Sequence, residues 1–297
     1  MKIKDILLKK NFIFSLEVFP PKPNVEIEPI LKVISELQIL KPDFISVTYG
    51  AGGSTTKRTV ELAERIQKDF NIPALAHITC IGATKEGITE ILDNLKNKGI
   101  ENVMALRGDI PHNEEKPFKD FRYASELVKF VKTRWDFCIG VAGYPEKHPE
   151  AENMQTDLQH LKEKVDAGAD FITTQLFLDN KHFFNYQKLV REIGVNVPII
   201  PGIMTAIKVA NIEKMASLCK IDIPEKFRKL VEKNKNINSE ICEDTIKYTI
   251  EQINDLIKNG IKAIHLYTMN KVEQNKRIYF GSEIVNIRKN ESIIDSN

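Results

Sequence analysis

The sequence of 297 residues lacks the features that mark several classes of protein. Its 43 Lys and Arg side chains nearly balance 41 Asp and Glu, a formal net charge of +2, so nothing favours a nucleic acid or a polyanionic surface as partner. No apolar run approaches the roughly 18 residues of a membrane span. The segment MKIKDILLKKNF has neither the apolar stretch nor the cleavage site of a signal peptide and predicts a short amphipathic helix. We therefore expect a cytoplasmic protein that does not enter a membrane.

Cysteine is scarce as well, and the chain has four: Cys80, Cys138, Cys219 and Cys242. They are far apart in the sequence, with no CxxC pair and no histidine at metal-ligand spacing, which predicts buried free thiols in a reducing compartment and no metal site. The sequence also lacks a nucleophile elbow and any strand that ends in a lysine suited to a Schiff base. Acyl transfer, metal-assisted hydrolysis and aldolase chemistry therefore lose support.

What the sequence does contain is a regular alternation of short apolar runs and longer amphipathic stretches. Residues 57–69, 84–98, 122–134, 153–168 and 180–193 have helical periodicity. The apolar, β-branched runs are eight in number and cover 12–19, 43–50, 74–80, 102–108, 137–144, 170–177, 197–204 and 262–269. Apolar strands separated by helices predict a parallel sheet covered on both faces, and eight such units predict a (β/α)8 TIM barrel of the α/β class. We expect a single domain over residues 1–297, with an extra helix and loop inserted within 205–261, before the eighth strand.

In such a barrel the functional side chains lie at the C-terminal ends of the strands. Polar or aromatic residues follow seven of the eight runs: Glu17, Thr48, Tyr49, His77, Arg107, Asp109, Tyr144, His148, Gln175 and Lys271. Their convergence favours Glu17 as a general acid over the alternative, a solvent-facing residue on an alternating strand. One acid, a second carboxylate, an amide and several aromatic or histidine side chains are typical of a site that uses an organic cofactor.

For three motifs at or after the strand ends, the sequence allows a structural interpretation as well as a functional one. His77 in ALAHITC fits a buried histidine bonded to a backbone carbonyl equally well. GAGGSTT at 50–56 resembles a phosphate cradle but matches neither nucleotide-binding motif, and a strand-to-helix turn with Ser54 as N-cap explains it better. YPEKHPE at 144–150 has two prolines that would stiffen a loop.

Nine blocks of sequence occur in an order and spacing that identify a family: SLEVFPPKP, KPDFISVTYGAGG, AHITCIGAT, ALRGD, VAGYPEKHPEA, LKEKVDAGAD, TTQLFLD, IIPGIM and LYTMNK. With these blocks, from about residue 10 to 287, the chain resembles the methylenetetrahydrofolate reductase family. The resemblance implies a TIM barrel that holds FAD and takes electrons from NADH or NADPH. It implies a ping-pong reaction that passes a hydride to 5,10-methylenetetrahydrofolate and gives 5-methyltetrahydrofolate.

The resemblance also implies roles for individual residues. Glu17 matches the family's general acid, which protonates the bridging nitrogen of the folate, and an apolar strand end would raise the pKa of its carboxyl. Asp109 matches an aspartate between flavin and folate that stabilises the cationic iminium. Gln175 matches an amide that contacts folate and nicotinamide in turn, and Thr48 matches a contact to the nicotinamide cofactor. The positions that match FAD contacts are Tyr49, Ala51, His77, Arg107, Gly108, Asp109, Tyr123, Ala124, Tyr144, His148, Ala151, Asp157 and Lys164, of which Arg107, His148 and Lys164 would offset the pyrophosphate charge.

Three substrate-site positions differ from the best-known bacterial members. Met215 stands in place of a phenylalanine that stacks on the substrate, Asn211 in place of a glutamine, and Lys271 in place of an arginine near the folate tail. A polarisable Met still covers a ring, and Lys meets a carboxylate without a bidentate fork. We expect a homo-oligomer. An alternative electron source is an iron–sulfur partner protein, and the alternative of a non-catalytic binding barrel is disfavoured by Glu17, Asp109 and Gln175.

Overall fold

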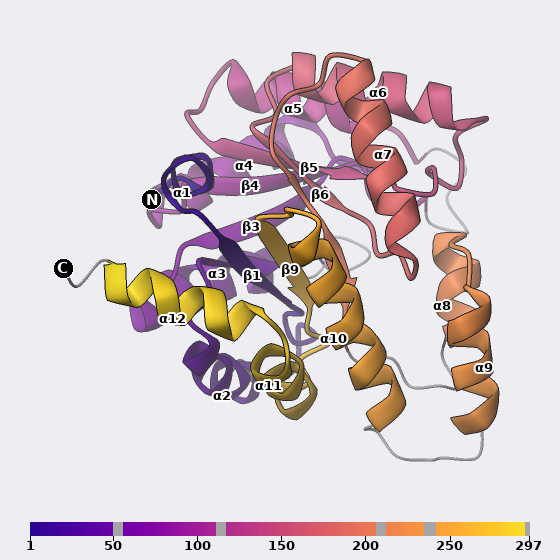
Figure 1. Cartoon of the computed structure of the whole chain (residues 1–297). Coiled ribbons are helices and arrows are strands. Elements are labelled where there is room, and N and C mark those ends of the chain that lie inside the picture. The colour runs from indigo at the N-terminus through magenta and orange to yellow at the C-terminus, as the bar shows by residue number, and fades with distance from the viewer. Residues whose placement is uncertain (50–55, 111–116, 206–211, 235–241, 295–297) are drawn as a thin grey trace.

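A closed parallel barrel forms the centre of the molecule (Figure 1). The computed structural model describes residues 1–49, 56–110, 117–205, 212–234 and 242–294. Its sheet has the order β7-β6-β5-β4-β3-β2-β1-β9-β8, and every pair is parallel. The strands are β1 (Ile13–Val18), β2 (Phe44–Val47), β3 (Ala74–Thr79), β4 (Asn102–Leu106), β5 (Cys138–Gly143), β6 (Phe171–Thr174), β7 (Ile199–Ile200), β8 (Gly202–Met204) and β9 (Ala263–Tyr267).

The short strands β7 and β8 are two halves of one barrel strand. Only Pro201 separates them, and a proline cannot donate a ladder hydrogen bond. β7 pairs with β6 on one side, and β8 pairs with β9 on the other, so together they close the sheet. Each of the eight apolar runs therefore contains one barrel strand, and the prediction of a (β/α)8 barrel is confirmed.

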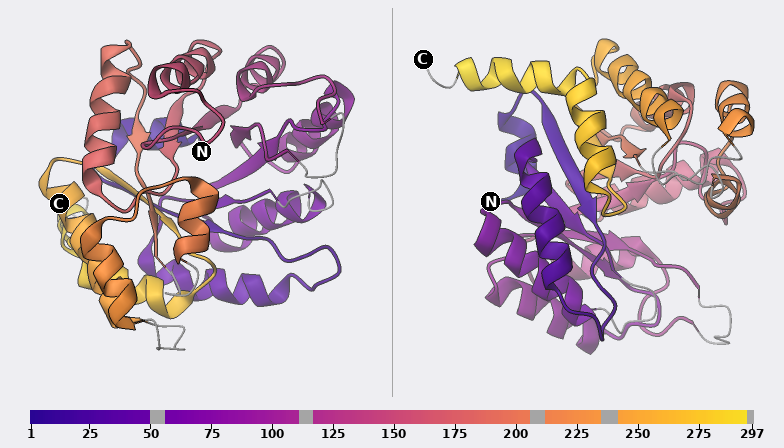
Figure 2. Two further views of the ribbon diagram at one scale, coloured as in Figure 1. Left: turned by 90° about the vertical axis from the view of Figure 1, so that its right-hand side faces the viewer. Right: turned by 90° about the horizontal axis from the view of Figure 1, so that it is seen from below.

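Amphipathic helices surround the barrel on its outer face (Figure 2). Their apolar stripes pack on the strands; in α2, for example, Ile30, Ile34 and Leu37 are buried. The helices around the barrel are α2 (Glu28–Leu37) with the short helix η1 (Gln38–Leu40), α3 (Thr56–Phe70), α4 (Lys85–Asn97), α5 (Ala124–Lys132), α6 (Met154–Asp166), α7 (Asn180–Glu192), α10 (Glu243–Lys258), α11 (Val272–Gly281) and α12 (Ile284–Ile294). The five helical stretches predicted from periodicity lie within two residues of α3 to α7.

A second apolar cluster fills the inside of the barrel at the N-terminal ends of its strands. Helix α1 (Ile3–Lys9) closes this end, and its buried Ile3 and Ile6 join Phe44 and Phe171 in the cluster. The predicted N-terminal helix is thus confirmed, and its role is to cover the barrel floor. Gly140 makes room there, because a Cβ at this position would lie 2.6 Å from the Phe171 ring.

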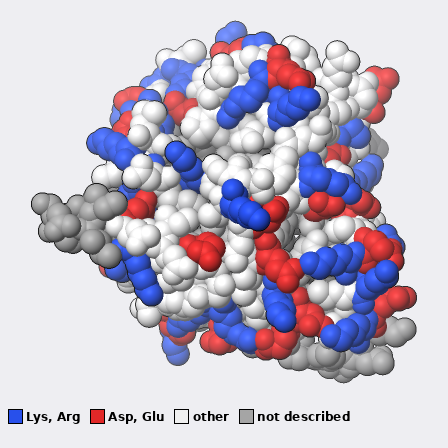
Figure 3. Space-filling model, viewed as in Figure 1, with Lys and Arg blue, Asp and Glu red and all other residues white. Residues whose placement is uncertain are grey.

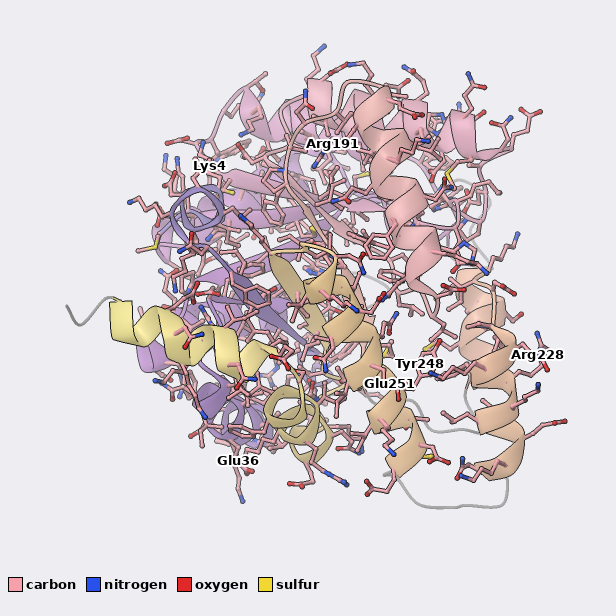
Figure 4. All side chains as sticks on the ribbon, viewed as in Figure 1. Lys4, Glu36, Arg191, Arg228, Tyr248 and Glu251 are labelled. Atoms are coloured by element: carbon pink, nitrogen blue, oxygen red, sulfur yellow. The ribbon has the colours of Figure 1, made fainter. Side chains whose placement is uncertain are left out.

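The insertion before the last barrel strand is larger than predicted. It holds two helices, α8 (Ile212–Cys219) and α9 (Glu225–Asn234), in addition to α10. Figure 4 shows Tyr248 and Glu251 of α10 on the side that faces α9, whereas Arg228 of α9 points away from α10. The rings of Phe227 and Tyr248 lie 4.7 Å apart between centroids, and Lys226 is paired with Glu251 at 2.6 Å. These contacts hold α9 against α10.

The surface has no face of one charge sign in the view of Figure 3, where acidic and basic side chains are interspersed. This agrees with the balanced composition. Within the described ranges, no helix has both the length and the apolar character that crossing a membrane requires.

Candidate active site

The inward side chains of β1 change from apolar to charged along the strand. Ile13 belongs to the apolar cluster at the N-terminal end, and Ser15 and Glu17 follow at intervals of two, which places them on the same inward face. The parallel pairing with β9 sets Ser15 beside His265 and Glu17 beside Tyr267. A polar layer therefore lies above the apolar one, at the C-terminal ends of the strands.

This layer lines a cavity of about 190 Å³. Of the residues predicted at the rim, the cavity brings together Glu17, His77, Tyr144 and Gln175. The polar side chains around them include Ser46, Thr173, His265 and Tyr267, which sequence reasoning missed. The signal for these was the same alternation of two along each strand that places Glu17 inside the barrel.

Glu17 is 7% exposed and lies at the centre of a cluster of hydrogen-bonding groups. Its Oε2 accepts from Ser46 Oγ at 3.3 Å and lies 3.5 Å from His77 Nε2 and 3.7 Å from His265 Nε2. Burial acts to raise the pKa of the Glu17 carboxyl, but the neighbouring His265 and His77 rings and the Ser46 hydroxyl outweigh it and lower the pKa. The expected raised pKa is therefore wrong, because the strand end is polar.

His77 lies between this cluster and the rest of the cavity. Burial lowers the pKa of its imidazole, the neighbouring His265 lowers it further, and Glu17 opposes both. His77 Nε2 lies 3.5 Å from Glu17 Oε2, so the ring of the ALAHITC motif faces the buried carboxylate.

A second group of predicted residues gathers where β5 ends and α6 begins. The backbone N–H of His148 donates to Asp157 at 3.1 Å, and its ring meets the edge of Tyr144 at 4.6 Å between centroids. Lys164 donates from Nζ to the carbonyl of Ala142 at 2.6 Å, and burial lowers the pKa of this amine to about 8. Ala151 is half-buried in the same loop. Tyr123 is the N-cap residue of α5 and stacks its ring on His160 of α6, and Ala124 is the first residue of α5.

Arg107 and its neighbours lie above the end of β4. The Arg107 guanidinium makes a bidentate pair with Glu150, with both distances 2.6 Å, so its charge is already matched by a carboxylate. Gly108 has a φ of +86°, and a Cβ there would lie 2.6 Å from Ile81, so this turn requires glycine. The hydrogen bond to Glu150 raises the pKa of Arg107, and burial raises the pKa values of Tyr144 and Cys219. Asp109 is exposed, and its charge adds to each of these shifts.

Other predicted site residues lie outside the cavity lining. Met215 of α8 packs against the cluster of Leu178 and Phe227, and Lys271 begins α11 as its N-cap residue. Thr48 follows β2, where its N–H donates to Val18 and its carbonyl accepts from Thr59. Tyr49 is half-buried beside it. Ala51, Asn211 and Ser54 fall outside the described residues.

The free cysteines agree with the sequence. Cys80, Cys138 and Cys242 are buried free thiols, and Cys219 is half-buried. Among the described residues no group of three or more His, Cys, Asp or Glu side chains is arranged to hold a metal ion.

The residues that match FAD contacts fit an anionic cofactor. Lys164 is a half-buried cation whose hydrogen bond goes to a neutral carbonyl, and its lowered pKa shows that burial is only partly compensated by Asp157. An incoming phosphate oxygen would complete that compensation. Fold and site together define a (β/α)8-barrel protein with a ligand cavity at the C-terminal strand ends and a buried carboxylate on its floor.

Comparison with known proteins narrows this class to a family. The family model described as methylenetetrahydrofolate reductase matches residues 2–282. The 5,10-methylenetetrahydrofolate reductase of Escherichia coli (strain K12) is 36% identical over 271 residues, which cover 89% of this chain and 88% of that protein. Methylenetetrahydrofolate reductase (NADH) 1 of Arabidopsis thaliana is 37% identical over 283 residues, covering 91% of this chain and 48% of the plant protein. The chain belongs to the methylenetetrahydrofolate reductase family and spans about half the length of its plant and fission yeast relatives.

A solved structure supports the fold. An uncharacterized protein from Clostridium thermocellum, described as binding two copies of 5-methyl-5,6,7,8-tetrahydrofolic acid, aligns with a TM-score of 0.66 and 18% identity. The alignment covers 96% of this chain and 99% of that protein. At this identity the likeness concerns the barrel alone.

Proposed function

We propose that this chain reduces 5,10-methylenetetrahydrofolate to 5-methyltetrahydrofolate, with FAD as the bound hydride carrier and NADH or NADPH as the electron donor in a ping-pong reaction. The observation that carries the proposal is Glu17, a buried carboxylate at the floor of the cavity, in a chain that matches the family model over residues 2–282. The plant relative named as an NADH enzyme favours NADH.

Glu17 serves as the general acid in this proposal. The reaction must open the five-membered ring of the substrate, and protonation of the bridging nitrogen makes that nitrogen a leaving group. Glu17 Oε2 accepts a hydrogen bond from Ser46 and lies near the rings of His77 and His265, which are side chains able to carry a proton. The carboxyl is screened from bulk water by its burial, so the proton passes to the substrate and not to solvent.

FAD, when bound, supplies the hydride, and the chain supplies the groups that hold it. Lys164 and His148, near the end of β5, are suited to the pyrophosphate. The half-buried Lys164 amine donates to a neutral carbonyl and has no carboxylate hydrogen-bonded to it, and His148 lies in the loop after β5. Arg107 contributes less to the pyrophosphate than its motif suggested, since Glu150 already pairs with it. The other matched positions would line the flavin and adenine: Tyr49, Ala51, His77, Gly108, Tyr123, Ala124, Tyr144, Ala151 and Asp157.

Asp109 and Gln175 orient the folate in this proposal. Gln175 lines the cavity, and Asp109, after the end of β4, acts electrostatically on the cavity residue Tyr144. In this role the Asp109 carboxylate would stabilise the positive charge that develops when the ring opens. Asn211, Met215 and Lys271 would contact the rest of the substrate, with Thr48 on the nicotinamide. Met215 already packs on Leu178 and Phe227, so an aromatic ring of the substrate would have to stack on the part of Met215 that these two residues leave uncovered.

The experiment is reconstitution followed by turnover. We expect the protein to purify yellow, to release FAD and not FMN on denaturation, and to form 5-methyltetrahydrofolate when given NADH and 5,10-methylenetetrahydrofolate. Protein that binds no FAD after reconstitution would contradict the proposal. Flavin that is reduced by neither NADH nor NADPH, but is reduced by dithionite and then reoxidised by the folate, would place the electron donor elsewhere.

A further inference from the structure

Four side chains inside the barrel form a continuous polar row from β9 to the carboxylate of Glu17. Ser15 Oγ lies 2.8 Å from His265 Nδ1, on one side of the ring. On the other side, Ser46 Oγ lies 3.4 Å from His265 Nε2 and 3.3 Å from Glu17 Oε2. His265 is 2% exposed, and Ser15 and Ser46 are fully buried. Bulk water therefore does not compete for these hydrogen bonds.

Ser15 lies where it can select the ring nitrogen of His265 that carries a proton. A hydroxyl has one proton to donate, and Ser15 Oγ is 3.4 Å from the carbonyl oxygen of Ile264 and 2.8 Å from His265 Nδ1. With its proton directed to the carbonyl, Ser15 Oγ accepts from Nδ1–H of His265. The neutral ring consequently presents the lone pair of Nε2 toward Ser46, and a second proton on the ring would lie at Nε2.

Ser46 bridges the ring and the carboxylate. The direct distance from His265 Nε2 to Glu17 Oε2 is 3.7 Å, which is too long for a hydrogen bond. A single hydroxyl at Ser46 can donate to Glu17 and accept from Nε2–H at the same time. The row therefore has the polarity of a proton path from His265 to Glu17.

We propose that His265 and Ser46 are positioning residues that hold the proton used by Glu17 and return it to the carboxylate. In this transfer the Nε2–H bond of the imidazolium breaks and its proton binds Ser46 Oγ. The original Ser46 O–H bond breaks, and that proton forms an O–H bond with Glu17 Oε2. The imidazolium becomes neutral and the carboxylate becomes a carboxylic acid, with no change of oxidation state. The use of this proton on a folate rests on the proposed function, whereas its storage does not.

The other titratable groups that face this row leave one proton to be shared. They are His77 of β3, Tyr267 of β9 and Tyr144, which follows β5, and the described cavity lining includes no Lys or Arg. Burial lowers the pKa of His77 and raises the pKa values of Tyr267 and Tyr144, so burial favours the neutral form of all three. The lowered pKa of Glu17 favours an ionised carboxylate, and the contacts through Ser46 connect that carboxylate to the His265 ring.

The pH profile of one half-reaction tests the path in the FAD-loaded protein. Wild type, Ser46→Ala and His265→Asn are reduced, then mixed with 5,10-methylenetetrahydrofolate, and the flavin absorbance is followed from pH 6 to 9. Reoxidation in both variants should be about 10- to 100-fold slower at pH 8 and should return toward the wild-type rate at pH 6. Each substitution removes a group that lowers the pKa of Glu17, so the buried carboxyl takes a proton from solvent more readily as the pH falls. Flavin reduction by NADH and the KM for folate should stay within about twofold of wild type, since neither depends on this proton.

Two further variants separate the path from a structural role. Ser46→Thr keeps the hydroxyl and should restore the wild-type profile. Ser282→Ala removes another buried serine hydroxyl, one that donates to Tyr279 far from the cavity, and should leave the profile unchanged. Equal slowing of Ser46→Ala at every pH, or no slowing at all, would overturn the proposal.

Nitrogen-15 NMR of the six histidines tests proton storage without folate turnover. The His265 signal, assigned with His265→Asn, should show the Nδ1–H tautomer when neutral and should lose its second proton at a lower pH in Glu17→Gln. Ser15→Ala should move the neutral ring toward the Nε2–H tautomer. If these signals are found in a protein that does not reduce the folate, the proton store stands and the proposed function fails. An Nε2–H tautomer in wild type, unaffected by Glu17→Gln, would refute the store.

Discussion

The two ends of the barrel interior are built from the same strands but differ in polarity and packing: one end is apolar and filled, and the other is polar and holds a cavity. At the N-terminal end Ile13 packs with Phe171, and α1 closes the floor with Ile3 and Ile6. Four residues further along β1, at the other end, Glu17 faces an open cavity. Apolar burial at the first end stabilises the fold by about 25 cal/mol per Å². The second end places a charge where burial is costly, and such a cost is typical of a site that performs chemistry.

The division repeats on the neighbouring strands. On β2 the inward side chains are Phe44 and then Ser46, and on β9 they are Ala263 and then His265. Phe44 marks the boundary, because its ring stacks on His265 with centroids 6.1 Å apart. The rigid apolar floor thus holds the polar layer in place. Substitutions at the two ends should therefore separate stability from activity.

The largest effect on stability should come from Phe171→Ala. Its ring is fully buried in the apolar end, and loss of such a ring costs about 3–5 kcal/mol of unfolding free energy. Urea denaturation measures the change, with Phe280→Ala on the exposed face of α11 as control, expected within about 0.5 kcal/mol of wild type. The kcat of the folded variant should match that of wild type. A lower kcat under conditions where the variant is fully folded would show that the apolar end also contributes to activity.

Asp109→Asn should act in the opposite sense. The side chain is exposed at the rim of the polar end, so the unfolding free energy should be nearly unchanged. Loss of its charge should slow folate reduction by about 10²–10³, the usual effect of removing one electrostatic contact to a transition state. Single-turnover reoxidation of the flavin gives the rate. A wild-type rate would remove Asp109 from the mechanism.

Lys164→Met should weaken FAD binding without preventing folding. A charge-assisted hydrogen bond contributes about 1.5–3 kcal/mol, so we expect the Kd for FAD to rise about 10- to 100-fold. Lys162→Met on the same helix is the matched control, because Lys162 pairs with Asp166 in solvent. Fluorescence titration of FAD compares the two, and equal Kd values would mean that Lys164 does not contact the cofactor.

The smallest effect should come from Ile3→Val, which removes one methylene beneath the apolar floor. The expected loss is about 0.5–1.5 kcal/mol of unfolding free energy, with no effect on either half-reaction. Leu8→Ala on the exposed side of the same helix should change stability by less than about 0.5 kcal/mol. Thermal unfolding resolves the pair. If both variants were equally stable, α1 would not be closing the barrel.

The strands and the position of Glu17 could be predicted from sequence because both depend on local patterns. Runs of β-branched residues are read directly, and alternation along FIFSLEVF puts Glu17 on the inward face. The partners of Glu17 could not be predicted in this way. His265 is 248 residues away from Glu17 in the chain, and only the parallel pairing of β1 with β9 brings it near.

The direction of the Glu17 pKa shift depends on that same long-range pairing. From the sequence the strand end is apolar, whereas the closed barrel surrounds the carboxylate with Ser46 and two histidines. The pairing of Arg107 with Glu150 could likewise not be predicted from the sequence, because the two residues follow different strands and meet only in the folded barrel. The packing of Met215 depends on the two helices of the insertion, whose number the sequence underestimated.

Stopped-flow measurement of the two half-reactions in Glu17→Gln tests the central claim most directly. Glutamine keeps the size of the side chain and one hydrogen-bond donor, so FAD binding and flavin reduction by NADH should match wild type. Reoxidation by 5,10-methylenetetrahydrofolate requires the acid and should slow by about 10²–10⁴. Equal slowing of both half-reactions would mean that Glu17 positions the flavin, and wild-type rates in both would contradict its role as the acid.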